Sequence, residues 1–270
     1  MEDNPIKEAT AVVGQPPAVR LGELKFDSSN TKPLGGINPY NPVFDVIGKQ
    51  YHRLLIEHAG LHSGSKILDI GCGTGRLAKQ LIDFLDKGRY TGLDNNKGYI
   101  DYCRETYPKS FTFDQFDVQH DEFNPSGVID PVTVELPYAN RQFDLVVALG
   151  LFNHFQFKWA AQYIRQVSRI LRPKGIFFGT FVLLNQQSMT FLESGKAKRP
   201  FRFQYHHDDG WFEYEDRPLL NVALPEQALR RVFIRSSLMI KEPIRYGQWC
   251  DSKLALTGHD IIIARKGGWQ

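Results

Sequence analysis

Three glycines follow a short apolar run near residue 70, and their spacing could bring a ligand against the main chain. The run Lys66–Ile70 contains Ile67, Leu68 and Ile70, and it leads into Gly71-Cys72-Gly73-Thr74-Gly75. Leucines at helical spacing begin directly afterwards. Glycine can adopt positive φ and has no Cβ to keep a ligand away from the backbone. A glycine turn between a strand and a helix therefore predicts a cofactor site.

The residues around these glycines argue against two loops that bind phosphate. A dinucleotide loop has a third glycine three residues after its second, and Arg76 occupies that position here. A triphosphate loop closes with Gly-Lys-Ser/Thr, which this turn lacks. The remaining pattern is Asp69-x-Gly71-x-Gly73-x-Gly75. A tight turn that binds nothing is the alternative interpretation.

This pattern resembles the first motif of class I S-adenosylmethionine-dependent methyltransferases. The resemblance implies S-adenosyl-L-methionine as cofactor and S-adenosyl-L-homocysteine as product. It implies that Asp69 and the backbone of Gly71–Gly75, which includes Cys72, hold the methionine portion. It also implies that Leu149 and Gly150, after a later strand, lie beside the sulfur.

An acid follows the strand expected over residues 89–94. Asp94 lies about 20 residues after Gly71, where a doubly wound fold places a carboxylate that accepts hydrogen bonds from ribose hydroxyls. Asn95 follows it and belongs to the same predicted cofactor site. Asp94 could also serve as the N-cap of the helix expected over residues 95–107.

A second acid follows the strand expected over residues 111–116. In the methyltransferase pattern this place belongs to the residue that meets the adenine amino group, which implies that Asp117 and the main chain of Val118 bind adenine. A solvated turn is the alternative. Residues 120–135 then form an inserted loop or hairpin, marked by the turn signal Asn124-Pro125-Ser126-Gly127. The insertion is similar to those of bacterial methyltransferases associated with glycan or small-molecule pathways.

Residues 142–150 are almost continuously apolar, which is typical of the central strand of a parallel sheet. Ligands of open α/β sheets bind outside the carboxyl ends of the strands, so the segment Leu151–Phe155 would face the ligand. Histidine titrates near neutral pH, and His154 is therefore the candidate base for an acceptor hydroxyl. Alternatively, His154 caps the helix expected over residues 157–171 or makes a local hydrogen bond. With an amine acceptor, it would only orient the substrate.

The regular pattern lapses over residues 185–220, which are crowded with aromatic, histidine and charged side chains. Long aromatic-rich segments of compact domains are usually functional, so we expect an acceptor lid here. Its predicted substrate contacts are His206, His207 and Trp211, together with Tyr40 near the N-terminus. A β-hairpin with ordinary aromatic packing is the alternative.

The alternation of strands and helices predicts the α/β class. We expect a Rossmann-like, doubly wound, seven-stranded and mostly parallel sheet with an antiparallel last strand, preceded by a helix over residues 43–59. Residues 41–270 would form one methyltransferase domain with insertions at about 120–135 and 185–220. Residues 1–40 would be a mobile N-terminal segment or lid.

Composition and charge argue against several other classes of protein. The chain has 33 Lys and Arg against 30 Asp and Glu, and a net charge of +3 does not indicate a nucleic-acid footprint. Three widely spaced cysteines without a CxxC pair suggest neither a disulfide framework nor a zinc site, and they fit a reducing, cytoplasmic setting. The longest apolar stretch, Leu145–Phe152, is too short for a membrane span, and the N-terminus reads as lacking a targeting signal.

The absence of two motifs reduces the range of acceptors and metals that we expect. No Asn-Pro-Pro-aromatic or Asp-Pro-Pro-aromatic sequence follows the fourth expected strand, so the amines of nucleic-acid bases are not expected acceptors. No acidic trio for magnesium is evident, and we expect no metal. The sequence does not indicate the oligomeric state.

Together these features predict an enzyme, an S-adenosylmethionine-dependent methyltransferase that acts by in-line displacement on a hydroxyl of a small molecule or saccharide. Three alternatives stay open. These are an N-methyltransferase of a small-molecule amine, a non-catalytic cofactor-binding protein of the same fold, and a nicotinamide oxidoreductase, which Arg76 opposes.

Overall fold

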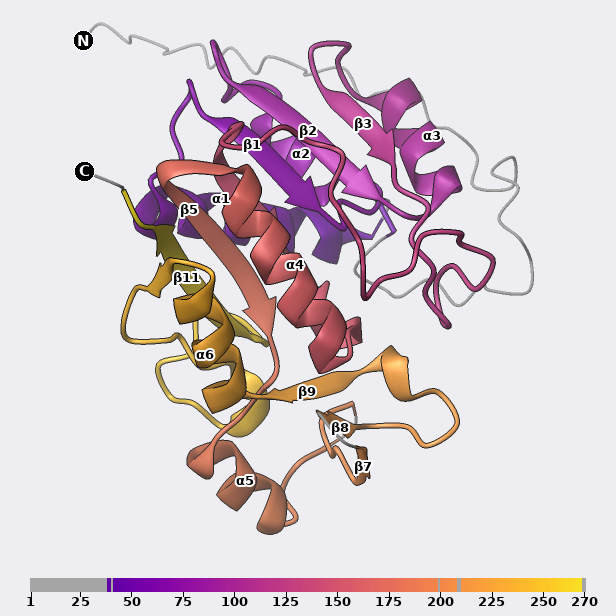
Figure 1. The fold of residues 1–270 in the computed structure, drawn as a ribbon, viewed down its shortest axis with the longest axis vertical. Coiled ribbons are helices and arrows are strands. Elements are labelled where there is room, and N and C mark those ends of the chain that lie inside the picture. Colours follow the sequence, from indigo (N-terminus) through magenta and orange to yellow (C-terminus); the bar gives the residue numbers. More distant parts are fainter. Residues whose placement is uncertain (1–37, 40, 199, 208–209, 269–270) are drawn as a thin grey trace, which may run out of the picture. The chain divides into compact units, whose positions relative to one another are not determined.

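The structure is a computed structural model that describes residues 38–39, 41–198, 200–207 and 210–268 (Figure 1). The described residues all belong to one compact unit, residues 32–270. Tyr40 and nearly all of the predicted N-terminal lid over residues 1–40 lie outside the described residues.

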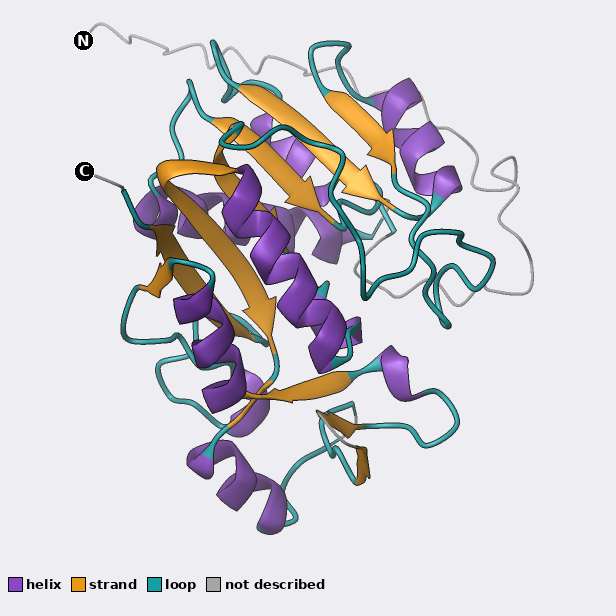
Figure 2. Cartoon of the chain, viewed as in Figure 1, coloured by secondary structure: helices purple, strands orange, loops and turns teal. Residues whose placement is uncertain are grey.

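A seven-stranded sheet forms the centre of this unit, in the order β10-β11-β5-β4-β1-β2-β3 (Figures 1 and 2). The strands from β1 to β5 pair in parallel, whereas β11 pairs antiparallel with both β5 and β10. This confirms the predicted Rossmann-like sheet with an antiparallel last strand. The strands are Lys66–Ile70 (β1), Arg89–Asp94 (β2), Thr112–Gln115 (β3), Phe143–Ala148 (β4), Leu171–Phe181 (β5), Leu238–Ile240 (β10) and Asp260–Lys266 (β11).

Helices cover both faces of this sheet. In Figure 1, α4 lies in front of β5 with α6 packed beside it, and α1 and α2 pack together behind the sheet. Helix α4 has an apolar stripe at helical spacing that is buried, since Ala160, Ile164, Val167 and Ile170 are each 0% exposed. The α-helices are Pro42–Ala59 (α1), Arg76–Leu81 (α2), Lys97–Thr106 (α3), Phe157–Ile170 (α4), Gln186–Glu193 (α5) and Glu226–Arg235 (α6). The short 3₁₀ helices are Phe152–His154 (η1), Pro218–Leu220 (η2) and Gln248–Cys250 (η3).

The capping residues of α1 agree with its sequence signals. The Asn41 side chain accepts a hydrogen bond from the N–H of Val43, and Pro42 is the first helical residue. Gly60 ends the helix with φ 70°, a left-handed conformation that favours glycine. Sequence and structure agree closely here because capping is a local interaction.

Two predicted boundaries were wrong. The helical spacing after the glycine turn predicts a helix to about residue 87, whereas helix α2 ends at Leu81. The sequence Arg172-Pro173-Lys174-Gly175 predicts a turn before a strand that begins at Ile176, whereas strand β5 begins at Leu171 and contains the turn. The turn is accommodated as an irregularity, since the register of β4 with β5 shifts there and Lys174 adopts φ 67°.

A second sheet follows β5, with the order β6-β9-β8-β7. Strands Tyr205–His207 (β7) and Gly210–Phe212 (β8) form an antiparallel hairpin, and β8 pairs with Val222–Pro225 (β9), which pairs with Leu183–Leu184 (β6). The hairpin considered as an alternative for the aromatic-rich segment is therefore present.

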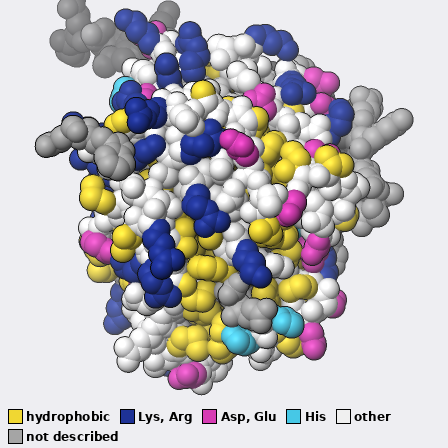
Figure 3. All heavy atoms as spheres, in the orientation of Figure 1, with side chains coloured by type: hydrophobic (Ala, Val, Ile, Leu, Met, Phe, Trp, Pro, Cys, Tyr) yellow, Lys and Arg dark blue, Asp and Glu magenta, His cyan; other side chains and the backbone are white. Residues whose placement is uncertain are grey.

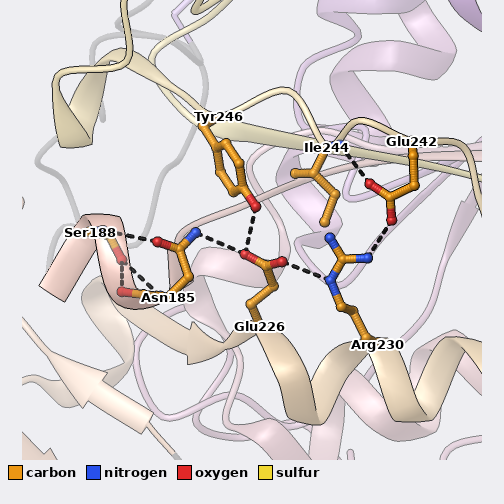
Figure 4. A network of polar contacts seen from close by, with 7 residues as sticks. All are labelled: Asn185, Ser188, Glu226, Arg230, Glu242, Ile244 and Tyr246. Carbon is orange, nitrogen blue, oxygen red and sulfur yellow. Dashed lines mark hydrogen bonds and ion pairs between the residues drawn. The ribbon is translucent and has the colours of Figure 1, made fainter.

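A buried polar network fixes the base of this second sheet to α6 (Figure 4). Glu226 is 3% exposed and accepts hydrogen bonds from Asn185 Nδ2 at 2.8 Å and from the Tyr246 hydroxyl at 3.0 Å. Arg230 donates to the other Glu226 oxygen at 2.7 Å and also pairs with Glu242. The residue that begins α5 is thus held to α6 and to the loop before β11.

A second buried carboxylate holds the stretch Tyr246–Cys250 in place. Asp260 is 0% exposed and accepts hydrogen bonds from the N–H groups of Leu183 and Gly247, both at 2.7 Å, and from Trp249 Nε1 at 2.9 Å. Burial raises the pKa of Asp260 to about 7. Asp260 therefore holds both this stretch and the start of the second sheet to β11.

In the part of the chain that the structure describes, no helix combines the length and the apolar character that a membrane span requires.

Candidate functional site

The glycine turn after β1 has the backbone conformation that its residue types predicted. Gly71, Gly73 and Gly75 adopt φ of 74°, 55° and 83°, values that strain any side chain. A Cβ at Gly75 would also lie 2.3 Å from the ring of Tyr107, whose hydroxyl donates to Gly75 O at 2.9 Å. The glycine at 75 is therefore required by packing against the end of α3, and not only by approach of a ligand.

Asp69 lies beneath this turn. Its side chain is 3% exposed, and the Tyr90 hydroxyl donates a hydrogen bond to Oδ2 at 2.8 Å. Burial raises the pKa of Asp69 to about 6, and the Tyr90 hydrogen bond opposes that shift. Sequence reasoning missed Tyr90, because the contact depends on the pairing of β1 with β2.

Asp94 ties the glycine turn to the end of β2. Its Oδ2 accepts a hydrogen bond from the N–H of Gly73 at 2.9 Å, and its Oδ1 accepts one from the N–H of Asn96 at 2.9 Å. Burial raises the pKa of Asp94, and these backbone donors oppose the shift. Each carboxylate oxygen can accept a second hydrogen bond, as a ribose hydroxyl would require. Asn96, not Asp94, is the N-cap of α3, since it accepts from Tyr99 N at 3.1 Å.

Asp117 and Val118 are held by two asparagines. Asn124 Nδ2 donates to Asp117 Oδ1 at 2.8 Å and to Val118 O at 3.0 Å, and Asn95 Nδ2 donates to Val118 O at 3.3 Å. The N–H of Val118 donates to Phe116 O at 2.7 Å, so an adenine nitrogen would share or replace that hydrogen bond. The insertion thus packs against the predicted adenine site.

The end of β4 leaves space for a ligand. Gly150 adopts φ 69°, and a Cβ built there would meet nothing within 4 Å. Its N–H donates to Thr180 Oγ1 at 2.7 Å, which fixes the main chain at this point. Leu149 is 9% exposed, and Leu151 lies 3.1 Å from the position of a Cβ on Gly71. The glycine turn and the end of β4 are therefore neighbours, and this open main chain fits a bound cofactor.

His154 ends η1, and both of its ring nitrogens have partners. Asn153 Nδ2 donates to Nε2 at 3.1 Å, and Nδ1 donates to Leu219 O at 3.3 Å. Burial lowers the pKa of His154 to about 3, and the neighbouring His120 lowers it further. With this pKa the ring is neutral at pH 7. Its contact with Asn153 is a local hydrogen bond, which was the alternative to catalysis, whereas its contact with Leu219 joins residues 65 positions apart.

Asn153 is a polar residue of this edge that sequence reasoning missed. It is 7% exposed, and no hydrogen-bond partner for its Oδ1 is found among the residues that the structure describes. Such an oxygen can accept a hydrogen bond from a ligand hydroxyl or amine.

The two insertions meet beside His154. The ring of Phe123, from the first insertion, lies edge-on to the His154 ring with 4.8 Å between centroids. Arg217, which precedes η2, donates through Nε to Glu122 Oε2 at 2.6 Å. The His120 ring donates through Nε2 to His154 O at 2.8 Å. Segments that are about 60 to 95 residues apart therefore surround one edge of the site.

The predicted substrate residues of the second insertion lie on its hairpin. His206 and His207 are exposed on β7, and the His206 ring lies 5.6 Å from that of Trp211. Figure 3 shows hydrophobic side chains gathered in this lower region, with histidines exposed beside them. A cavity of about 500 Å³ nearby is lined instead by Tyr205, Tyr214, Glu215 and Asp216.

Over the described residues, no three His, Cys, Asp or Glu side chains are grouped so that they could hold a metal ion.

Comparison with known proteins agrees with this geometry. Residues 67–175, from β1 to the irregular start of β5, match the family described as a methyltransferase domain. The chain is 30% identical over 125 residues to the 27-O-demethylrifamycin SV methyltransferase of Amycolatopsis mediterranei, covering 46% of this chain and 41% of that protein. It is 25% identical over 138 residues to a sterol 24-C-methyltransferase of Gibberella zeae, covering 51% of this chain and 33% of that protein. The matched region therefore spans less than half the length of these curated relatives.

Solved structures share the fold over a larger part of the chain. A protein of Pyrococcus horikoshii OT3 superposes with a TM-score of 0.57 at 16% sequence identity, covering 85% of this chain and 93% of that one. At this identity the similarity concerns the fold alone.

Proposed function

We propose that the chain is a class I S-adenosylmethionine-dependent methyltransferase and that it transfers the methyl group to a hydroxyl of a small molecule or saccharide. The hydrogen bond from Gly73 to Asp94 is the observation that carries this proposal. It joins the glycine turn to the carboxylate placed for a ribose, so that one sheet edge can hold the methionine portion and the ribose of the cofactor side by side.

We propose that different residues of this edge bind different parts of the cofactor. The backbone of Gly71–Gly75, including Cys72, would hold the methionine portion, and Asp94 with Asn95 would hold the ribose. Asp69 would support the turn from beneath, since only 3% of it is exposed. Asp117 and Val118 would hold the adenine.

The reaction would depend mainly on positioning. The cofactor, when bound, supplies a sulfonium, which is already a good leaving group. The chain must therefore hold the acceptor atom in line with the methyl group and exclude water. Leu149 and Gly150 would lie beside the sulfur, where the open side of Gly150 leaves room.

His154 is the candidate residue at the acceptor. With a pKa of about 3, it would be a weak base at neutral pH, and it would act as one only if the acceptor replaced Asn153 at Nε2. An orienting role, with Asn153 Oδ1 accepting a hydrogen bond from the acceptor, agrees better with these contacts. The low basicity of His154 also supports a second candidate function, N-methylation of a small-molecule amine, which needs no strong base.

Two substitutions separate these roles of His154. His154→Gln keeps hydrogen-bonding groups but cannot take up a proton, whereas His154→Ala removes both properties. If His154 orients the acceptor, the Gln variant keeps most of the turnover and the Ala variant loses it. If His154 is the base, both variants lose about 10²- to 10⁴-fold in kcat.

We also propose that residues 185–220 form the acceptor lid. Deleting the segment is a poor test, because Phe203 and Phe212 are 0% and 6% exposed and pack in hydrophobic clusters. His206→Ala and Trp211→Ala are better, since the His206 side chain is exposed and the Trp211 side chain is only partly buried. Both substitutions should raise the KM for the acceptor and leave the cofactor Kd unchanged; an equal effect on both constants would contradict a lid.

Calorimetry and mass spectrometry test the function itself. We expect the protein to bind S-adenosylhomocysteine and not NAD. Incubation with S-adenosylmethionine and a panel of alcohols, saccharides and amines should then add one methyl group to members of one class. Addition to nitrogen would establish the second candidate, and cofactor binding without methyl transfer to any acceptor would favour a non-catalytic protein.

A further inference from the structure

The insertion after β3 places one asparagine side chain on the predicted adenine site. We propose that Asn124 is a positioning residue that orients Asp117 toward the adenine amino group, an inference that rests on the proposed function. Nothing in the methyltransferase pattern of the sequence assigns a role to this insertion.

The contacts of Asn124 link successive residues of the site. Its Nδ2 donates one hydrogen bond to Asp117 Oδ1 at 2.8 Å and another to Val118 O at 3.0 Å. An amide NH₂ group has two hydrogens, so both are used. The side chain of Asp117 and the main chain of Val118 are therefore fixed relative to each other by one group.

The local fold explains why an asparagine and a glycine stand three residues apart. The backbones of His120 and Asn124 exchange hydrogen bonds of 3.0 and 2.8 Å, and Gly127 N donates to Asn124 O at 3.0 Å. A Cβ on Gly127 would lie 2.6 Å from both Asn124 Nδ2 and the backbone N of Gln119. Only glycine at position 127 leaves room for the Asn124 amide. The turn signal at residues 124–127 therefore supports the contact of Asn124 with Asp117.

The orientation of the amide has a chemical consequence. A donor at Oδ1 leaves Oδ2 of Asp117 as a hydrogen-bond acceptor of defined direction. Adenine presents a donating amino group at the corresponding position of its ring, whereas hypoxanthine presents an accepting carbonyl oxygen. Asp117 held in this way would favour an adenosyl over an inosyl cofactor.

The test compares S-adenosylhomocysteine with S-inosylhomocysteine by calorimetry at pH 7. We expect the wild type to bind the adenosyl compound at least tenfold more tightly. Asn124→Asp removes the donor and brings a second carboxylate to Asp117, so that the pair retains a proton. When the inosyl compound binds, that proton can move to Asp117 Oδ2, where it is donated to the inosyl carbonyl instead of being shared between the two carboxylates. The variant should therefore bind the adenosyl compound about tenfold more weakly and lose most of the preference.

Asn140→Asp is the matched control. Asn140 is exposed, and its Oδ1 accepts from Arg169 at 3.0 Å, an interaction that a carboxylate keeps. The control makes the same change in charge, and both affinities should stay at wild-type values. If Asn124→Asp does not fold, Asn124→Ala is measured in the same way, and its preference should also fall because Asp117 is no longer fixed.

The outcomes are distinguishable. An unchanged preference in the Asn124 variants would overturn the inference, as would an equal loss of affinity for both compounds, which indicates only a structural role. A wild type that binds neither compound would overturn the proposed function and this inference together.

Discussion

Each acid of the cofactor edge has a different environment. Asp69 is bound to Tyr90, Asp94 accepts from two backbone N–H groups, and Asp117 accepts from an asparagine amide. These environments separate acids that look alike in the sequence. Asp94 and Asp117 retain accepting capacity for a ligand, whereas Asp69 is 3% exposed and is hydrogen-bonded to Tyr90 of β2.

Asp94→Asn tests the role of the second acid. One carboxylate oxygen becomes an NH₂ group, which would face the N–H of either Gly73 or Asn96. We expect S-adenosylhomocysteine to bind about 10- to 100-fold more weakly, because a charge-assisted hydrogen bond contributes about 1.5–3 kcal/mol. Calorimetry measures the change. Asp83→Asn, an exposed substitution with the same change in charge, should bind normally, and equal affinities for the two variants would contradict the ribose role.

His154 should make stability depend on pH. Its pKa falls from 6.5 to about 3 on folding, so the unfolded chain binds the extra proton between these values. The contribution of the neutral His154 ring to the free energy of unfolding is fully present above about pH 6.5, and it is lost as the pH falls toward 3. Relative to His154→Gln, the wild type should lose up to about 1.4 kcal/mol of unfolding free energy per pH unit in this window. Denaturant titrations at pH 7, 5.5 and 4.5 measure the difference, and parallel profiles would refute it.

At the scale of elements, the two insertions form one structure rather than two independent loops. The first packs Phe123 on His154, and the second supplies Leu219 O to the same ring. An ion pair between Glu122 and Arg217 also joins the two insertions. This arrangement suits a site in which the acceptor must be enclosed before transfer.

A double-mutant cycle tests that contact. Glu122→Gln and Arg217→Gln should each destabilise the protein, and together they should show a coupling of about 1 kcal/mol, because the glutamate side chain is 9% exposed and the arginine is 48% exposed. Chemical denaturation measures the cycle. Strict additivity of the two single substitutions would mean that the pair does not hold the insertions together.

At the scale of the whole molecule, buried carboxylates connect the second sheet to the main sheet. Asp260 lies on β11 yet accepts from Leu183 on β6 and from the Gly247–Trp249 loop. Glu226 does the same between α5, α6 and Tyr246 (Figure 4). These buried hydrogen bonds thus attach the lid proposed over residues 185–220 to the main sheet.

Asp260→Asn tests this connection. The introduced NH₂ group would face donors that now have an acceptor, so at least one buried N–H would lose its partner. We expect a loss of about 1–3 kcal/mol in unfolding free energy. Asp251→Asn is the control, because Asp251 is exposed and directly follows the Tyr246–Cys250 stretch that Asp260 holds. A stability equal to that of the control would show that the carboxylate is not required.

The sequence by itself determined the features that depend on near neighbours. The glycine turn, the apolar central strand, the caps of α1 and the stripe on α4 all follow from conformational preference and periodicity. Because parallel strands place their carboxyl ends at one edge, the same patterns predicted that the glycine turn, Asp94 and the end of β4 would meet.

Only the tertiary structure decided which side chains complete this edge. The contacts of Tyr90 with Asp69, Arg217 with Glu122, and Leu219 with His154 join residues 21 to 95 positions apart. No local preference selects such pairs, since they depend on how strands and insertions pack together. For the same reason, His154 has the pKa of a buried ring rather than that of a free histidine.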